Sequence, residues 1–167
     1  MATYILIATT TVGSGGAASI VFSGIPQTYT DLHLIASIRS NTGYESDEFY
    51  LQFNGLTTNL SYRTLIGVPN TGSAASNTSS AGYFNGNTAT ASVFGNLGIY
   101  IPNYTSSNYK SFSSDSVNEN NGATTRPSFA AGLWSSTAAI TSCTIVSTGA
   151  STLLQYSSAS LYGIKNS

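Results

Sequence analysis

The residues best suited to chemistry stand in one short stretch. Residues 25–40, IPQTYTDLHLIASIRS, contain the only histidine, His33, and the arginine Arg39. Histidine is the commonest general base in enzymes. The stretch alternates as a β-strand does, which would place His33 and Arg39 about 20 Å apart, too far to act on one substrate atom. We therefore expect His33 to face solvent or a neighbouring subunit, and Arg39 to form an ion pair across an interface.

The acidic residues suggest two further kinds of chemistry. Glu45, Asp47 and Glu48 form the only acidic cluster, and carboxylate oxygens are ligands for Ca²⁺. Their spacing matches no calcium-binding loop, so we expect a solvated loop. A glycosidase would need two carboxylates about 5 to 10 Å apart, and Asp115 or Glu119 would have to supply the second. No spacing argument brings either acid to the cluster, so we expect no catalytic residue.

The remaining reactive features also lack partners. Cys143 is the only cysteine and lies in the apolar run 140–146, where a thiol usually packs as a small hydrophobic side chain. The glycine-rich segment 12–16 lacks the lysine and the helix of a phosphate-binding loop, and no G-x-S-x-G nucleophile turn with partners is present. We predict no cofactor, no metal ion and no enzymatic activity.

The composition argues against several classes of partner. Only 7% of the 167 residues are charged and the formal net charge is −1, whereas typical globular proteins have about 25% charged residues. The five lysines and arginines are scattered singly, which argues against nucleic-acid binding. No stretch reaches the ~20 apolar residues of a membrane span, and the start lacks the features of a secretory signal. We expect one domain, residues 1–167, made in the cytoplasm with no membrane partner.

The pattern of residue types predicts an all-β fold. β-branched and aromatic residues recur at period two, and Gly, Asn and Ser clusters interrupt them. Ten strands are expected, at residues 4–11, 18–22, 32–40, 48–53, 62–68, 91–101, 110–116, 128–135, 141–146 and 157–164. Many short strands in one domain favour an antiparallel β-sandwich of the jelly-roll type over a closed barrel. The polar stretches 69–80 and 118–127 are expected to be long loops at the rim, which either bind partners or serve only as solvated connectors.

Alternation within residues 32–39 assigns the two faces of that strand. The core face takes Leu32, Leu34, Ala36 and Ile38. The outer face takes His33, Ile35, Ser37 and Arg39. Before the strand, Pro26 fixes its own φ and Asp31 can accept hydrogen bonds from backbone amides, which predicts a corner that sets the register.

Two segments resemble a known family. Residues 19–32, SIVFSGIPQTYTDL, are similar to the opening of many small virion structural proteins of tailed bacteriophages. Residues 132–145, GLWSSTAAITSCTI, and the later LYGI at 161–164 are similar to the closing strands of the same proteins. The resemblance covers about the first 40 and last 35 residues and leaves the middle unmatched. Residues 153–156, LLQY, depart from the Gly-Ser turn expected before the last strand.

The resemblance implies a non-enzymatic virion component with a jelly-roll-like sandwich, often trimeric. Our first expectation is a capsid decoration or cement protein that binds the major capsid protein, or other virion proteins, as a homotrimer and stabilises the head. Its location would be the virion. Apolar residues on outward strand faces are candidates for subunit contacts, although they could equally belong to the core. The candidate interface residues are Ile35, His33, Arg39, Tyr50 and Tyr100.

The alternative is a receptor-binding module of a tail fibre that recognises host surface carbohydrate. Tyrosine rings stack on sugars, and asparagine side chains donate hydrogen bonds to them. The candidate stacking residues are Tyr44, Tyr83, Tyr104 and Tyr109. Tyrosine is also a preferred strand residue, so the eleven tyrosines favour neither reading by their number alone.

Overall fold

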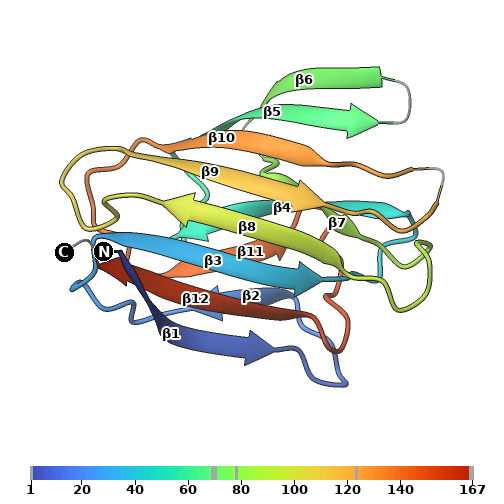
Figure 1. The fold of residues 1–167 in the computed structure, drawn as a ribbon, viewed down its shortest axis with the longest axis horizontal. Helices are drawn as coiled ribbons and strands as arrows, with labels where there is room; N and C mark the ends of the chain where they lie inside the picture. The colour runs from blue at the N-terminus through green and yellow to red at the C-terminus, as the bar shows by residue number, and fades with distance from the viewer. Residues whose placement is uncertain (1, 69–70, 78, 123, 166–167) are drawn as a thin grey trace.

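The fold is known from a computed structural model that describes residues 2–68, 71–77, 79–122 and 124–165. These residues form twelve β-strands and no helix (Figure 1). The strands are β1 (Thr3–Thr11), β2 (Ser19–Phe22), β3 (Asp31–Ile38), β4 (Ser46–Phe53), β5 (Leu60–Val68), β6 (Thr71–Asn77), β7 (Gly82–Asn85), β8 (Gly95–Ile101), β9 (Lys110–Val117), β10 (Ser128–Trp134), β11 (Cys143–Ser147) and β12 (Ser158–Lys165). The all-β prediction is confirmed, and each of the ten expected strands is present with small shifts at its ends.

Two strands, β6 and β7, were not expected from the sequence. Strand β6 occupies part of the stretch 69–80, so the prediction of a loop there is wrong for residues 71–77; residues 69–70 and 78 lie outside the described part. The described residues of the second stretch, 118–122 and 124–127, contain no strand. Strand β6 has no apolar alternation because both of its faces are exposed from Thr71 to Ser76.

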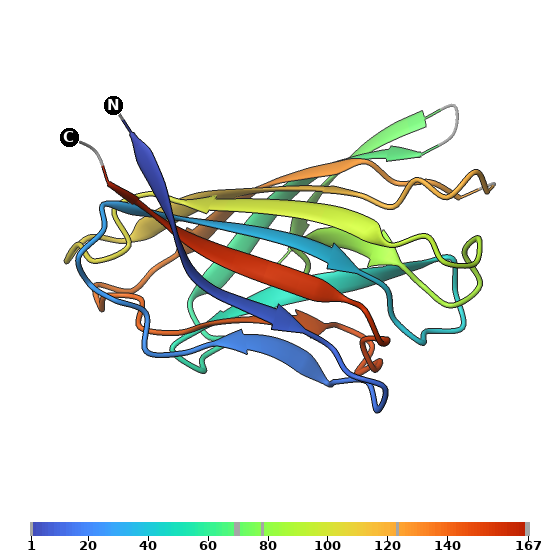
Figure 2. The same cartoon turned by 60° about the horizontal axis from the view of Figure 1, so that its bottom comes forward.

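The strands form two antiparallel sheets. The larger sheet has eight strands in the order β1-β12-β3-β8-β9-β10-β5-β6. The smaller sheet has four strands in the order β2-β11-β4-β7. In Figure 2 the smaller sheet lies beneath the larger one, and contacts of β7 with β8, β9 and β10 join the two. Neighbouring strands in each sheet are often distant in the sequence, so most of the chain is needed before either sheet is complete.

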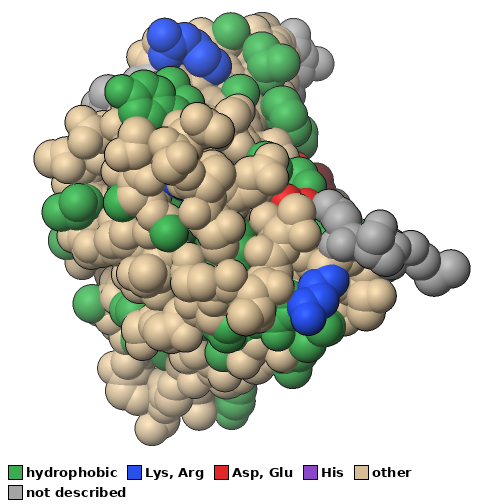
Figure 3. Space-filling model, turned by 90° about the vertical axis from the view of Figure 1, so that its left-hand side faces the viewer, with side chains coloured by type: hydrophobic (Ala, Val, Ile, Leu, Met, Phe, Trp, Pro, Cys, Tyr) green, Lys and Arg blue, Asp and Glu red, His purple; other side chains and the backbone are tan. Residues whose placement is uncertain are grey.

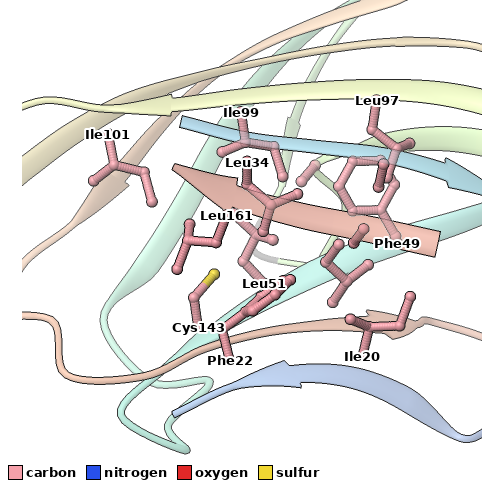
Figure 4. Close-up of a cluster of buried hydrophobic side chains, with 14 of the residues drawn as sticks. Ile20, Phe22, Leu34, Phe49, Leu51, Leu97, Ile99, Ile101, Cys143 and Leu161 are labelled. Atoms are coloured by element: carbon pink, nitrogen blue, oxygen red, sulfur yellow. The ribbon is translucent and has the colours of Figure 1, made fainter. Parts of the chain in front are cut away.

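The facing sides of the two sheets share one hydrophobic core (Figure 4). Side chains such as Leu34 and Leu161 from the larger sheet meet Phe49 and Leu51 from the smaller one. Burial of such side chains is the main driving force for folding, about 25 cal/mol for each Å² of apolar surface removed from water. The predicted core face of β3 is confirmed, because its four inward residues are at most 4% exposed.

Cys143 is part of this core. Its side chain is fully buried, and burial raises the pKa of the thiol to about 12. The prediction that this cysteine packs as a hydrophobic residue is confirmed. A thiol that stays protonated and inaccessible is unreactive, because the thiolate is the nucleophilic form.

The predicted corner before β3 is confirmed. The Asp31 carboxylate accepts a hydrogen bond from the backbone N–H of Asn103 at 2.8 Å, and another from the Tyr100 hydroxyl at 2.8 Å. These two bonds tie the start of β3 to the end of β8, with which it is paired. The same end of the molecule carries both termini, and its surface consists mostly of uncharged polar side chains and backbone (Figure 3).

Candidate binding surfaces

Three of the five candidate interface residues meet on the outer face of the larger sheet. His33 and Ile35 point outward from β3, and Tyr100 pairs directly with His33 from β8. On the other side of β3, Tyr162 of β12 pairs with His33, and Leu6 of β1 pairs with Tyr162. The result is a row of four large side chains, Leu6–Tyr162–His33–Tyr100, across four adjacent strands. We call this the outer row.

The outer row is apolar and partly exposed. Leu6 is 54% exposed and Tyr100 38%, and the neighbouring Ile35 is 44% exposed. The Tyr4 ring meets the His33 ring edge-on, with 5.8 Å between their centroids. Sequence reasoning did not name Leu6, Tyr4 or Tyr162, because only strand pairing brings the N- and C-terminal strands beside β3.

The chemistry of the outer row suits contact rather than catalysis. Burial lowers the pKa of His33 below 6.5 despite an opposing effect from Asp115, so its imidazole is neutral near pH 7. Burial, followed by the hydrogen bond to Asp31, raises the pKa of Tyr100 to about 12. Neither group is therefore charged at neutral pH, so covering these two side chains does not require desolvating an ion. The exposed carboxylate of Asp115 lies on the same face, where β9 pairs it with Gly98, so a partner must leave that group in contact with water.

A second apolar area lies farther along the same face. Phe129 of β10 is 51% exposed and pairs with Leu65 of β5, which is 61% exposed. Around them is a shallow hollow of about 710 Å³. The sequence did not reveal this area, because Phe129 and Leu133 point outward while the small residues Ser128, Ala130 and Gly132 point inward. A Cβ at Gly132 would lie 2.2 Å from ring atoms of Phe112, so the space inside is already filled.

Arg39 does not lie on this face, and the prediction that its side chain points outward is wrong. Strand β3 ends at Ile38, and beyond it the Arg39 side chain turns inward and is only 6% exposed. Its guanidinium donates to four backbone carbonyls, those of Asn87, Ala89, Thr90 and Val93, at 2.7–3.0 Å. These bonds fix the loop between β7 and β8, and they occupy the donors that an intersubunit ion pair would require.

Tyr50 is separate from the other candidates. It lies on the outer face of the smaller sheet, where β4 pairs it with Val146 of β11, and it is half-buried. The two sheets face each other through the core, so a partner on the outer row would not reach Tyr50. The structure thus divides the candidate interface residues between two opposite faces and the interior.

A polar groove lies at the end of the molecule where β4 begins. It has a volume of about 620 Å³ and contains the acidic cluster. The prediction that this cluster is a solvated loop is wrong for Asp47, which lies in β4 and is only 6% exposed. Asp47 is buried and accepts a hydrogen bond from the Ser147 hydroxyl at 2.9 Å, while Glu48 accepts one from Tyr83 at 2.9 Å. Within the described part of the chain, no three His, Cys, Asp or Glu side chains form a group that could hold a metal ion.

The four tyrosines considered for sugar stacking have different positions. Tyr44 and Tyr83 line the groove. Tyr109 is 60% exposed at the opposite end of the molecule, just before β9. Tyr104 is fully buried and donates to the Pro26 carbonyl, so the prediction that it stacks on a sugar is wrong. Asp115 lies on the outer face of β9, away from the acids of the groove.

Comparison with known proteins identifies no family or related structure for this chain. No protein-family model, curated protein or solved structure matches the chain. The described residues contain no helix that could cross a membrane. The function is therefore argued from the surfaces described above.

Proposed function

We propose that the chain is a jelly roll with two inserted hairpins. Without β5, β6, β9 and β10, two sheets of four strands remain, β1-β12-β3-β8 and β2-β11-β4-β7. These eight strands change sheet at every connection except that from β4 to β7, which is the path of a double Greek key. The β5–β6 and β9–β10 segments then extend one sheet of the sandwich.

We propose that this module is a non-enzymatic virion structural protein, a capsid decoration or cement protein that acts as a homotrimer. The observation that carries the proposal is the outer row, four large uncharged side chains across four strands that nothing in the described chain covers. Exposed apolar surface of this kind is typical of protein–protein contact sites. The resemblance of the first and last segments to phage virion proteins supports the same conclusion.

Attachment would depend on repeated weak contacts. Each subunit offers a modest neutral surface to the major capsid protein or to its own neighbours, and trimer symmetry multiplies those contacts. With 7% charged residues, few contacts would rest on charges that salt screens or pH changes. The proposal therefore expects attachment that persists in high salt.

The proposal is tested by the number of copies in purified particles. Quantitative mass spectrometry should find hundreds of copies, in a simple ratio to the major capsid protein. Particles that carry Ile35→Glu, which places a charge beside the outer row, should lose most copies while those with Ser111→Glu, farther along the same face, retain them. A few to a few dozen copies would instead indicate the tail, and no copies would refute a virion role.

A further inference from the structure

The polar groove lies away from the outer row and has features that the virion proposal does not use. It is bounded by residues 42–48, by Tyr83 and Thr88, by Thr124 and Arg126, and by Thr148 and Gly149. A volume of about 620 Å³ lies within the range of roughly 300–1,000 Å³ found for small-molecule sites. The groove can therefore hold a ligand of the size of one or two sugar rings.

The walls of the groove are fixed by backbone hydrogen bonds. Gly86 N–H donates to the Glu45 carbonyl at 2.9 Å, and Asn87 N–H donates to the Thr42 carbonyl at 3.0 Å. On the other side, Thr148 N–H donates to the Glu48 carbonyl at 2.9 Å. A Cβ at Gly86 would lie 2.1 Å from the Tyr44 carbonyl oxygen, so the two segments approach as closely as glycine allows. A site held in this way loses little entropy when a ligand binds.

Two groups in the groove have unused hydrogen-bonding capacity. Glu45 Oε2 and Arg126 Nε are buried atoms with no hydrogen-bond partner among the described residues, so each would gain one if its side chain turned toward a ligand in the groove. The Arg126 guanidinium is held over the Tyr83 ring, 4.9 Å from its centroid, and that tyrosine donates to Glu48. The Glu45 carboxylate is an acceptor and the Arg126 guanidinium is a donor. A hydroxyl group both donates and accepts hydrogen bonds, so it can pair with either one.

An aromatic ring stands at the edge of the same groove. Tyr44 is 75% exposed, the largest exposure of any large hydrophobic side chain of the described residues. An exposed ring beside hydrogen-bonding groups offers an apolar face to a ligand that has both an apolar face and polar edges. Pyranose sugars have this form, whereas a metal ion or a small anion has no surface for the ring to cover.

The excess of negative charge in the groove favours uncharged sugars over acidic ones. Three carboxylates, Glu45, Asp47 and Glu48, face one guanidinium, Arg126. An acidic sugar would bring its own negative charge next to this excess, which is unfavourable at close range. We propose that the groove binds an uncharged pyranose, with Tyr44 stacked on the ring and Glu45 and Arg126 hydrogen-bonded to its hydroxyls.

The test is an NMR titration of the full chain with the methyl glycosides of glucose, galactose, mannose and N-acetylglucosamine. At least one should shift the amide resonances of residues 42–48 saturably at millimolar concentrations. Tyr44→Ala should weaken that binding about tenfold, the loss of one stacking contact. Tyr109→Ala removes another exposed ring, at the opposite end, and should leave the affinity unchanged. Both rings are exposed, so both variants should keep the wild-type fold and spectrum.

Several outcomes would overturn the proposal. Absence of shifts with all four glycosides, stronger binding of glucuronate than of the neutral sugars, or equal weakening by Tyr44→Ala and Tyr109→Ala would each do so. Saturable binding of Ca²⁺ alone at these residues, with no effect of the glycosides, would make the groove a cation site instead. None of these results depends on the number of copies in a particle, so this proposal and the virion proposal can fail separately.

Discussion

Each end of the molecule buries one cation, and the two are held differently. Arg39, at the end with the groove, donates to four carbonyls of a single loop. Lys110, at the end with the termini, is 1% exposed and donates to the carbonyls of Ser136 and Ala138. Its ammonium group also lies 5.5 Å from the centroid of the Trp134 ring. Both cations therefore organise a loop through backbone oxygens rather than through a carboxylate.

The difference follows from the two head groups. A guanidinium has five N–H donors in a planar fork, so one arginine can satisfy several carbonyls of an irregular loop. An ammonium is a compact charge with three donors, and burial lowers the pKa of Lys110. Loop geometry at one end is thus fixed by hydrogen bonds, and at the other by fewer bonds together with aromatic packing.

The largest expected effect is that of Arg39→Met. The change keeps an apolar stem of similar length but leaves four carbonyls without their donor, and unpaired buried polar groups cost about 1–3 kcal/mol each before relaxation. We expect a loss of about 4 kcal/mol in the free energy of unfolding, measured by urea denaturation. Arg63→Met, at an exposed site on β5, is the matched control and should change stability by less than about 0.5 kcal/mol. Similar losses in both variants would contradict the role given to Arg39.

Alkaline pH should change the stability contributed by groups at the Lys110 end. Tyr62 packs in the aromatic cluster of the Lys110 end, and burial raises its pKa from 10.0 to about 12. Between those values the unfolded chain has lost a proton that the folded chain keeps, so stability falls as pH rises, by up to about 3 kcal/mol for this group. Cys143, raised from 9.0 to about 12, acts in the same direction from a lower pH.

The titration of Lys110 changes stability with pH in the opposite direction. Its lowered pKa means that the unfolded chain holds the proton more tightly, so its contribution to stability improves as pH rises toward 10.5. An arginine keeps its charge throughout this range. Urea denaturation at a series of alkaline pH values should show a net decline above about pH 9, less steep in Tyr62→Phe than in the control Tyr109→Phe. A flat profile would refute the assignment.

The next effect in size is that of Lys110→Met. The apolar stem still covers Trp134, and only two hydrogen bonds are lost, so we expect a loss of about 2 kcal/mol, roughly half that for Arg39→Met. Lys165→Met, at the exposed end of the last strand, is the control. If the lysine variant proved the less stable of the two, the contrast between guanidinium and ammonium would be wrong.

The smallest effect on stability should come from Ile35, beside the outer row. Ile35→Glu changes an exposed side chain, so the monomer should lose less than about 0.5 kcal/mol. Its effect should appear in association instead, as a shift from trimer to monomer in sedimentation equilibrium. A wild-type chain that stays monomeric at all concentrations would remove self-association from the proposed function, and a variant that still forms trimers would place the contact elsewhere.

The sequence predicted the parts of the fold in which one face of a strand is buried. In β3 the alternation correctly assigned every inward residue and placed His33 and Ile35 on the outer face. Successive side chains of a strand point to opposite faces, so only one of the two possible assignments buries the apolar residues. It failed at Arg39, one residue past the strand, where alternation no longer applies. It also failed at β6, whose exposed faces need no hydrophobic residues.

The candidate surfaces were harder to predict than the strands. The outer row requires Leu6, His33 and Tyr162 to meet, and strand order supplies that information, not local pattern. The groove likewise combines Tyr44, Tyr83 and Arg126 from three separate segments. Tyr104 could not be distinguished from Tyr44 in the sequence, since a buried tyrosine and an exposed one differ in their surroundings rather than in their neighbours along the chain.

The pairing of the first and last strands has a mechanical consequence. Thr3 lies opposite Lys165, and the ladder between β1 and β12 runs from this pair to Thr11 and Ser158. A force that pulls the two ends of the described chain apart would load these hydrogen bonds one pair at a time, beginning at Thr3, instead of shearing all of them together. The protein should therefore yield at low force when stretched from both ends, with β1 peeling away first and exposing the edge of β12.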